Sequence, residues 1–175
     1  MITEIPIIDR VLDRHAADLR EDFTAYRNHA YRVVNLCLAL SPSGSTDVEK
    51  IGLAAAFHDL GIWTDHTFDY LAPSVRLASA HLIATGHEGW STEITQMILE
   101  HHKLSPFRGS GLVEQFRCAD WVDVSRGLFR CGLSRQCVNQ VLSTWPDCGF
   151  HKRLLVLGLR RLGTHPWNPL PMVRL

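Results

Sequence analysis

Four ionisable residues interrupt segments of the sequence that otherwise have the apolar periodicity of buried helices. His58 and Asp59 end the alanine-rich stretch AAAFHDLG, and His29 and Asp120 each lie on the apolar stripe of a helix-periodic segment. A buried ionised carboxylate without a partner is very costly in free energy, so each must be paired or bound to a metal. We therefore expect these four residues, which we call the quartet, to meet in the interior.

The quartet combines two imidazoles and two carboxylates, which form a suitable ligand set for one divalent first-row metal ion. Imidazole nitrogen suits Mn, Fe, Co, Ni or Zn, and carboxylate oxygen supplies negative charge and also admits Mg. The alternative is that the four side chains only pair with one another, through His–Asp hydrogen bonds.

The order of the quartet along the chain resembles the H…HD…D signature of the HD superfamily of metal-dependent phosphohydrolases. The local sequences NHAYRV, AAAFHDLG and FRCADWVD carry the resemblance, which covers roughly residues 20–130. It implies an all-α HD-domain fold and a metal site made of His29, His58, Asp59 and Asp120. It also implies a reaction in which a metal-bound water attacks the phosphorus atom of a small phosphorylated metabolite or nucleotide. Asp59 would orient that water and act as its base.

Two further histidines, His101 and His102 in ILEHHKL, lie within the region that the resemblance covers. We expect one of them to donate a proton to the leaving group or to contact the phosphate. Some HD enzymes bind a second metal through two extra histidines, but Ser74 stands where the earlier one is expected, and His81 lies two turns further along. We therefore favour one metal over two. The alternative for His102 is a surface position beside a helix C-terminus, which favours a protonated imidazole.

Two basic residues are candidates for binding a phosphate group. Arg32 follows His29 by one turn, as in HxxR patterns near HD sites, and a guanidinium there can make bidentate contacts with phosphate. Lys103 follows the histidine pair and is a candidate for the same role. The alternative for Arg32 is a solvated helix residue.

Asp123 and His66 complete the candidate substrate-binding residues. Asp123 lies one turn after Asp120 on the same face, and two close buried carboxylates raise one another's pKa unless a cation intervenes. The alternative is that Asp123 pairs with Arg126 or Arg117. His66 lies in the loop after the His–Asp doublet, where it either helps to shape the substrate pocket or is an ordinary surface residue.

The elements that must position these residues are helices, because most of the chain has helical period and convincing alternating strands are absent. We expect one all-α domain over residues 1–175 with about seven helices. Its motif-bearing core is at about 20–130, and C-terminal helices with an extended, proline-rich tail occupy 131–175. The predicted helices are 17–40, 47 or 48 to 59, 74–85, 92–102, 111–128, 134–144 and 150–162.

Local signals predict where several of these helices begin and end. Thr46 and Glu49 have the spacing of a capping box. Gly61 is expected to stop the helix that carries the doublet by adopting a left-handed conformation, and Gly86 to end the next helix. Ser134 is expected to cap the helix that follows it.

The composition limits the partners and the location that we expect. Lys plus Arg and Asp plus Glu each total 18, so the net charge is zero, which argues against nucleic-acid polymers and membranes as partners. Five cysteines form no CxxC pair, and their odd number fits no disulfide framework. No signal peptide or run of about 20 apolar residues is present, so we expect a cytoplasmic protein. Its expected partner is a small phosphorylated molecule, and the sequence is also compatible with a homodimer.

Other functions fit the same motif. HD-like folds also include oxygenases with two irons, and hydratases or lyases that act on small nitrogen compounds. A metal-stabilised binding module without catalytic activity is the third hypothesis. Some HD nucleotidases have a catalytic Glu just after the doublet, but residues 60–87 contain none, which disfavours a direct assignment as a nucleotidase.

Overall fold

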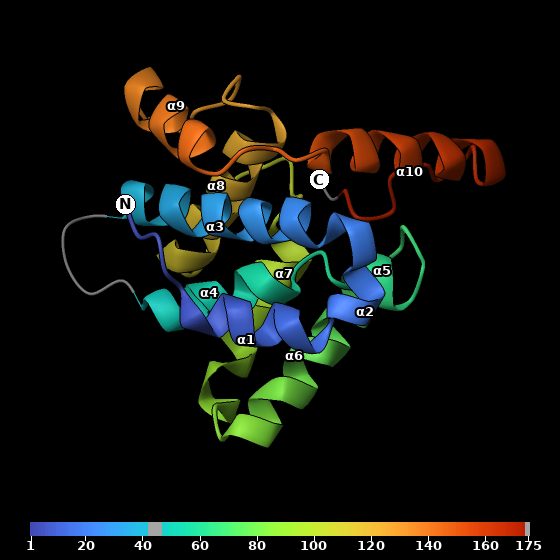
Figure 1. Ribbon diagram of the computed structural model, residues 1–175, viewed down its shortest axis with the longest axis horizontal. Coiled ribbons are helices and arrows are strands. Elements are labelled where there is room, and N and C mark those ends of the chain that lie inside the picture. The colour runs from blue at the N-terminus through green and yellow to red at the C-terminus, as the bar shows by residue number, and fades with distance from the viewer. Residues whose placement is uncertain (42–46, 174–175) are drawn as a thin grey trace.

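Residues 1–41 and 47–173, which the computed structural model describes, form helices and no strand (Figure 1). The expectation of an all-α protein is confirmed, with eight helices of nine residues or more and two short ones. In chain order the elements are α1 (Pro6–Arg14), α2 (Ala16–Leu19), η1 (Arg20–Asp22), α3 (Phe23–Leu40), α4 (Val48–Phe57), α5 (Gly61–Thr64), α6 (Leu71–Thr85), η2 (Glu88–Trp90), α7 (Ser91–Glu100), α8 (Gly111–Val124), α9 (Arg135–Thr144) and α10 (Phe150–Thr164).

The helix α3 is the centre of the fold and packs against α1, α4, α8 and α9 (Figure 1). Every residue from 28 to 37 is buried, although this segment includes asparagine, histidine and arginine. A helix surrounded on all sides cannot keep its polar residues in water, so these side chains must find partners inside. The polar residues of α3 therefore point into the protein and build the site described below.

The helix α4 is short and strongly apolar, and residues 51–57 are all buried. Its alanines have small side chains, which allow α1, α3 and α7 to lie against it. The predicted start of this helix is confirmed: it begins at Val48, and the Asp47 side chain accepts a hydrogen bond from the Lys50 amide. Thr46 of the predicted capping box lies outside the described residues.

The first helix, α1, is not among the predicted elements. It begins with Pro6, whose fixed φ suits the first helical position, and it buries Ile8 and Leu12 against α3 and α4. The predicted segment 17–40 is in fact divided, because α2 and η1 precede α3 and the continuous helix begins only at Phe23.

Two backbone conformations explain where other helices end. The segment predicted as 111–128 stops at Val124, because Arg126 and Gly127 both adopt positive φ angles of 53° and 79°. Gly86 ends α6 as predicted, and it does so in a left-handed conformation with φ of 72°.

Three further helices are close to their predicted positions. α6 begins three residues early, at Leu71, and its Pro73 lies in the first turn, where no backbone donor is needed. α7 ends at Glu100, so His101 and His102 lie in the turn that follows it. α9 has the predicted Ser134 cap, whose side chain accepts a hydrogen bond from the amide of residue 137.

The C-terminal helix α10 contacts α3 near its own start and extends beyond the other helices (Figure 1). The tail after it does not run extended over the surface as predicted. Residues 165–173 form turns, and Met172 is buried. The tail therefore folds back and contributes an apolar side chain to the core.

Gly61 does not stop a helix in a left-handed conformation, which corrects the prediction. It is the first residue of α5, and its φ is not positive. A Cβ atom at Gly61 would lie 2.6 Å from the Tyr70 carbonyl oxygen and 2.9 Å from Pro73 Cβ. Its amide donates to Ser74 Oγ at 3.0 Å. Glycine is needed because the turn after α4 packs directly on the start of α6.

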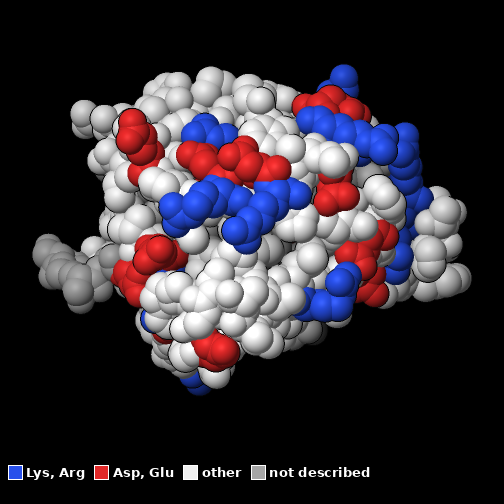
Figure 2. All heavy atoms as spheres, turned by 60° about the horizontal axis from the view of Figure 1, so that its bottom comes forward, with Lys and Arg blue, Asp and Glu red and all other residues white. Residues whose placement is uncertain are grey.

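The surface carries both signs of charge close together. On the face shown in Figure 2, acidic and basic side chains lie next to one another, and a run of basic side chains follows one edge. None of the described helices is long and apolar enough to cross a lipid bilayer. All five cysteines lie in the described part of the chain and are free thiols.

The close packing at Gly61 gives a stability prediction. Gly61→Ala should lower the free energy of unfolding by about 2 kcal/mol, because the new methyl group meets backbone that cannot move aside. Gly111→Ala is the matched control, since a Cβ there has no neighbour within 4 Å. Urea unfolding of the two variants measures the difference, and equal stability would show that the contact at Gly61 is not tight.

Candidate metal centre

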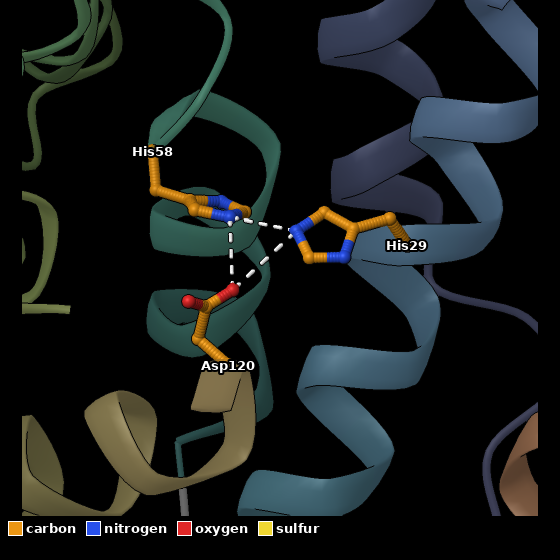
Figure 3. Close-up of side chains that lie close together, drawn as sticks. All are labelled: His29, His58 and Asp120. Atoms are coloured by element: carbon orange, nitrogen blue, oxygen red, sulfur yellow. Dashed lines mark hydrogen bonds and ion pairs between the residues drawn. The ribbon is translucent and has the colours of Figure 1, made fainter. Parts of the chain in front are cut away.

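Three helices bring His29, His58 and Asp120 together (Figure 3). His29 comes from α3, His58 follows the last residue of α4, and Asp120 comes from α8. The two histidine Nε2 atoms are 2.9 Å apart. Asp120 Oδ1 lies 3.6 Å from Nε2 of His29 and 3.7 Å from Nε2 of His58. All three side chains are essentially inaccessible to solvent.

Asp59 lies beside the same two nitrogens, so the structure brings the whole predicted quartet together. Its Oδ2 atom is 3.7 Å from Nε2 of His29 and 3.5 Å from Nε2 of His58. Its Oδ1 atom is 3.4 Å from Nε2 of His101. The doublet thus contributes a carboxylate that faces two sides of the cluster.

The other ring nitrogen of each quartet histidine is occupied, which fixes the tautomer. His58 Nδ1 lies 2.9 Å from the Ala55 carbonyl oxygen, which can only accept, so Nδ1 carries a hydrogen. His29 Nδ1 likewise donates to Asp123 Oδ2 at 2.6 Å. In the neutral rings both Nε2 atoms therefore present lone pairs, and these face each other. Such an arrangement is stable only with a cation or a proton between the nitrogens.

The quartet carboxylates also lack ordinary partners. Within the described part of the chain, Asp59 Oδ1 and both carboxylate oxygens of Asp120 are buried without a hydrogen bond. Burying unpartnered anionic oxygens costs several kcal/mol, and a bound cation removes that cost. The donor set therefore fits a divalent metal ion better than it fits the alternative of internal His–Asp hydrogen bonds.

The electrostatics of the metal-free cluster place one proton in it. Burial lowers the pKa of His58, but the Asp59 and Asp120 carboxylates outweigh burial and raise it to about 9. Burial lowers the pKa of His29 despite its hydrogen bond to Asp123, so that ring stays neutral. A protonated His58 then donates from Nε2 to Nε2 of His29. This proton occupies the position between the two nitrogens that a metal would take.

His101 and His102 extend the cluster towards α7. His101 Nδ1 donates to the Ile98 carbonyl at 2.7 Å, and its Nε2 atom faces Asp59. His102 Nδ1 lies 3.7 Å from Asp120 Oδ2. Six residues thus form three overlapping groups whose ligand atoms lie within 4.8 Å of one another: His29, His58 and Asp120; His58, Asp59 and His101; and His101, His102 and Asp120.

His102 is not the protonated surface residue of the alternative interpretation. Its side chain is only 14% exposed, and its Nε2 atom lies 2.7 Å from the Tyr70 hydroxyl. Burial and the neighbouring His101 lower its pKa to about 3, so the ring is neutral. In the metal-free protein His102 is thus an acceptor for the Tyr70 hydroxyl.

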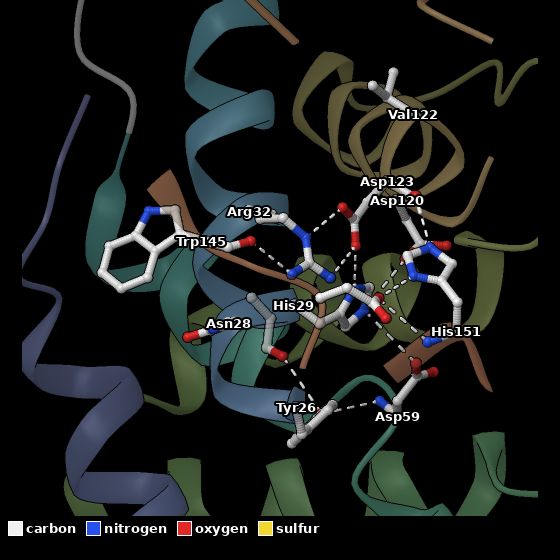
Figure 4. A network of polar contacts seen from close by, with 12 residues as sticks. Tyr26, Asn28, His29, Arg32, Asp59, Asp120, Val122, Asp123, Trp145 and His151 are labelled. Carbon is white, nitrogen blue, oxygen red and sulfur yellow. Dashed lines mark hydrogen bonds and ion pairs between the residues drawn. The ribbon is translucent and has the colours of Figure 1, made fainter. Parts of the chain in front are cut away.

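Arg32 and Asp123 lie behind His29 and form a buried pair (Figure 4). Arg32 donates from Nε to Asp123 Oδ1 at 2.5 Å and from Nη2 to Asp123 Oδ2 at 2.9 Å. Burial raises the pKa of Asp123, but His29 and Arg32 outweigh it and hold the carboxyl ionised. Arg32 also donates to the Trp145 carbonyl at 3.0 Å. Both residues, predicted to bind substrate, here hold the His29 ring in place.

The alternative partners considered for Asp123 are occupied elsewhere or are not observed. Arg117 donates to Glu114 on its own helix, and Asp123 shows no ion pair with Arg126 in the described residues. The Arg32–Asp123 pair spans the packed helices α3 and α8. It therefore ties together the two helices that supply His29 and Asp120.

Lys103 and His66 are the predicted substrate-binding residues that the structure does not bring into the cluster. Lys103 Nζ lies 4.0 Å from Glu100 Oε2, and the Lys103 carbonyl accepts hydrogen bonds from Arg117 and Trp121. His66 is exposed after α5 and lines a separate cavity of about 270 Å³.

Three aromatic residues complete the surroundings of the cluster and were not predicted. The Tyr26 hydroxyl donates to the Ala56 carbonyl at 3.0 Å and accepts from the Asp59 amide at 3.3 Å. The Phe150 ring stacks on the ring of His29 with centroids 4.0 Å apart, and Tyr70 contacts the histidine pair. Only Tyr26 had a usable signal, because it lies one turn before His29 on the same apolar stripe.

Comparison of this chain with known protein families, with curated proteins and with solved structures finds no match. The structure itself supports an all-α domain with a buried cluster of His and Asp residues that is able to hold a metal ion.

Metal binding should release a proton. Because the pKa of His58 is about 9 in the metal-free protein, its proton must leave near neutral pH when a metal takes Nε2. We expect about one proton released per ion, and an apparent affinity that rises about tenfold per pH unit below that pKa. Calorimetric titration with Zn²⁺ in buffers of different ionisation enthalpy measures it. Binding without proton release near neutral pH would contradict the shared-proton arrangement.

Loss of the Asp123 carboxylate should weaken metal binding without removing a ligand. Asp123→Asn is expected to lower the affinity about 10- to 100-fold, because His29 loses the charged acceptor that orients its ring and fixes its tautomer. Asp9→Asn is a matched control, since Asp9 also accepts from an arginine, Arg27, but away from the cluster. Competition with a fluorescent chelator measures both, and equal affinities would exclude the orienting role.

Proposed function

We propose that this protein is a metal-dependent hydrolase of the HD type, and specifically a phosphohydrolase that acts on a small phosphorylated molecule. One observation carries the metal requirement: two histidine Nε2 atoms lie 2.9 Å apart, beside carboxylate oxygens of Asp59 and Asp120 that are buried without a hydrogen bond to any described residue. The resemblance of the quartet motifs to the HD superfamily supports the reaction class.

We assign His29, His58 and Asp120 as ligands of one divalent ion, with Asp59 completing the set. When bound, such an ion lowers the pKa of a water molecule and stabilises the charge that develops on a phosphoryl group. Asp59 suits the role of base, because one carboxylate oxygen faces the His29 and His58 nitrogens while the other faces His101. Asp123 and Arg32 act as positioning residues for His29.

In this proposal the substrate reaches the cluster from the side formed by His101 and His102. His102 has the more exposed side chain of the two, and Tyr70 holds its Nε2 atom. We assign the contact with the leaving group to His102 and the Tyr70 hydroxyl, with the hydroxyl as a hydrogen-bond donor to the leaving-group oxygen. His101 remains inside, where its Nε2 atom faces Asp59.

An oxygenase with two metals is the second candidate function, and the group made by His101, His102 and Asp120 favours keeping it. Ser74 argues against it, because its hydroxyl binds the Gly61 amide at the turn and adds no ligand to the cluster. Metal analysis separates the two candidates: one ion per chain supports the hydrolase, and two irons per chain support the oxygenase.

The test of the proposed function is phosphate release. The protein loaded separately with Mn²⁺, Fe²⁺, Co²⁺, Ni²⁺ or Zn²⁺ should hydrolyse at least one compound in a panel of phosphomonoesters and phosphodiesters. Asp59→Asn should lower kcat by about 100-fold or more at unchanged fold, because it removes both a ligand and the base. Asp65→Asn is the control, since Asp65 pairs with Arg76 on the surface. Full activity of the Asp59 variant would refute the assignment.

A further inference from the structure

A cavity of about 490 Å³ lies against the cluster, between α8, α10 and the tail. Its size is in the usual range for small-molecule sites, roughly 300–1,000 Å³. Leu154, Leu155, Leu159 and Leu162 of α10 form one wall, and Trp121 of α8 and Met172 of the tail form others. The turns in the tail, which were not predicted from the sequence, thus complete this cavity.

The cavity meets the cluster at one end. Tyr70 and His102 line it there, and the Tyr70 hydroxyl binds His102 Nε2 at 2.7 Å. His102 Nδ1 faces Asp120 Oδ2 at 3.7 Å, so a single imidazole separates the cavity from the quartet carboxylate. The side chain of His102 is 14% exposed, whereas those of the other five cluster residues are at most 3% exposed.

The rest of the lining is apolar. Apart from Tyr70 and His102, the lining residues that the structure describes are Phe, Trp, Val, Leu, Gly, Pro and Met, and none of these is Lys, Arg, Asp or Glu. The two cations expected to bind phosphate are also elsewhere, because Arg32 is held by Asp123 and Lys103 does not line the cavity. Among the described lining residues, a phosphate group would therefore find a partner only at the cluster end.

The mouth of the cavity has apolar side chains that face water. Leu155, Leu159, Leu162 and Leu170 are each about half exposed or more, and all four belong to the lining. Covering such side chains with an apolar group is favourable in free energy, because it removes apolar surface from water. Polarity therefore decreases along the cavity from the cluster to these leucines, which matches a molecule with one polar and one apolar end.

We propose that the substrate is an amphiphile: a phosphoester of an apolar alcohol whose hydrocarbon group fills this cavity while its polar head meets His102, Tyr70 and the metal ligands. The inference rests on the proposed function for the reaction at the head and extends it to the class of substrate. The observation that carries it is that a leucine-lined cavity, uncharged in its described lining, joins the cluster at His102, the most exposed of the six described cluster residues.

Two glycines of α10 provide a matched pair of variants. A Cβ at Gly158, which lines the cavity, would have Phe68 Cε1 at 3.9 Å as its neighbour, an ordinary van der Waals contact, so a side chain there starts towards the cavity without a clash at its Cβ. A Cβ at Gly163 has nothing within 4 Å. Gly158→Leu and Gly163→Leu thus make the same chemical change in the same helix, and both raise helix propensity. Gly158→Ala is an intermediate step that adds only one methyl group.

The experiment compares two ligands that cannot be hydrolysed, decylphosphonate and methylphosphonate, on the Mn²⁺-loaded protein by calorimetry. We expect the decyl compound to bind about 100-fold more tightly, because its chain is buried. In Gly158→Leu this ratio should fall below about tenfold, with Gly158→Ala between, while Gly163→Leu keeps the full ratio. Melting temperatures at or above that of the parent protein verify that both leucine variants fold.

Several outcomes would overturn the proposal. Equal affinity for the two phosphonates would show that the cavity does not hold the chain. Equal ratios in Gly158→Leu and Gly163→Leu would place the chain elsewhere. Light scattering that shows a dimer unaffected by decylphosphonate would assign the leucines to a second copy of this chain, and binding to phosphatidylcholine vesicles in place of monomeric ligand would assign them to a lipid surface.

The same measurements separate this inference from the proposed function. Phosphate release that does not depend on chain length, together with equal phosphonate affinities, would leave the phosphohydrolase standing and remove the amphiphile. Binding of 1-decanol that is lost in Gly158→Leu, with no phosphate released from any ester, would support the apolar cavity and remove the phosphohydrolase.

Discussion

The structure depends on two imidazole Nε2 atoms that are held 2.9 Å apart and share one proton in the metal-free protein. Two imidazole rings would not keep this arrangement unless each ring were fixed from behind and a positive charge lay between them. The fixing groups are the Ala55 carbonyl for His58 and the Asp123 carboxylate for His29. The packing of α4 on α3 follows from the same need, because the alanines of α4 let the two helices approach closely.

The charges of the buried groups show what the cluster requires. Asp59, Asp120 and Asp123 are three buried carboxylates whose pKa values lie below their usual range, and Arg32 is the buried cation among them. Together the three carboxylates and Arg32 carry a net charge of two negative units. The proton on His58 compensates one of them in the metal-free protein, and a divalent ion in its place compensates both. A second divalent ion would bring excess positive charge and would need additional anionic ligands, which agrees with the preference for one metal.

The sequence was sufficient to predict the quartet and the helices that carry it, because a charged residue on an apolar stripe is a strong signal when burial is costly. It was not sufficient where the role of a residue depends on contacts with residues distant in the sequence. Gly61 has the sequence setting of a helix stop, yet its role comes from the Tyr70 carbonyl nine residues away. Arg32 has the spacing of a phosphate ligand, but its direction is set by Asp123 on a distant helix. Tyr70 had no signal at all, because its contact with His102 exists only after α6 and α7 pack together.

The apolar cavity and the charged cluster are complementary, because the cavity can keep water away from the cluster. A metal site surrounded by low-dielectric groups makes each electrostatic interaction stronger than it would be in water, but only while water is kept out. The cluster is closed on the α3 and α4 side by buried helices, and Phe150 covers the His29 ring. The remaining side opens at His102 to leucines of α10. In the proposal of an amphiphilic substrate, a hydrocarbon group in that position would exclude water from the side of the cluster at His102. The unreactive part of such a substrate would then complete the environment in which the head reacts.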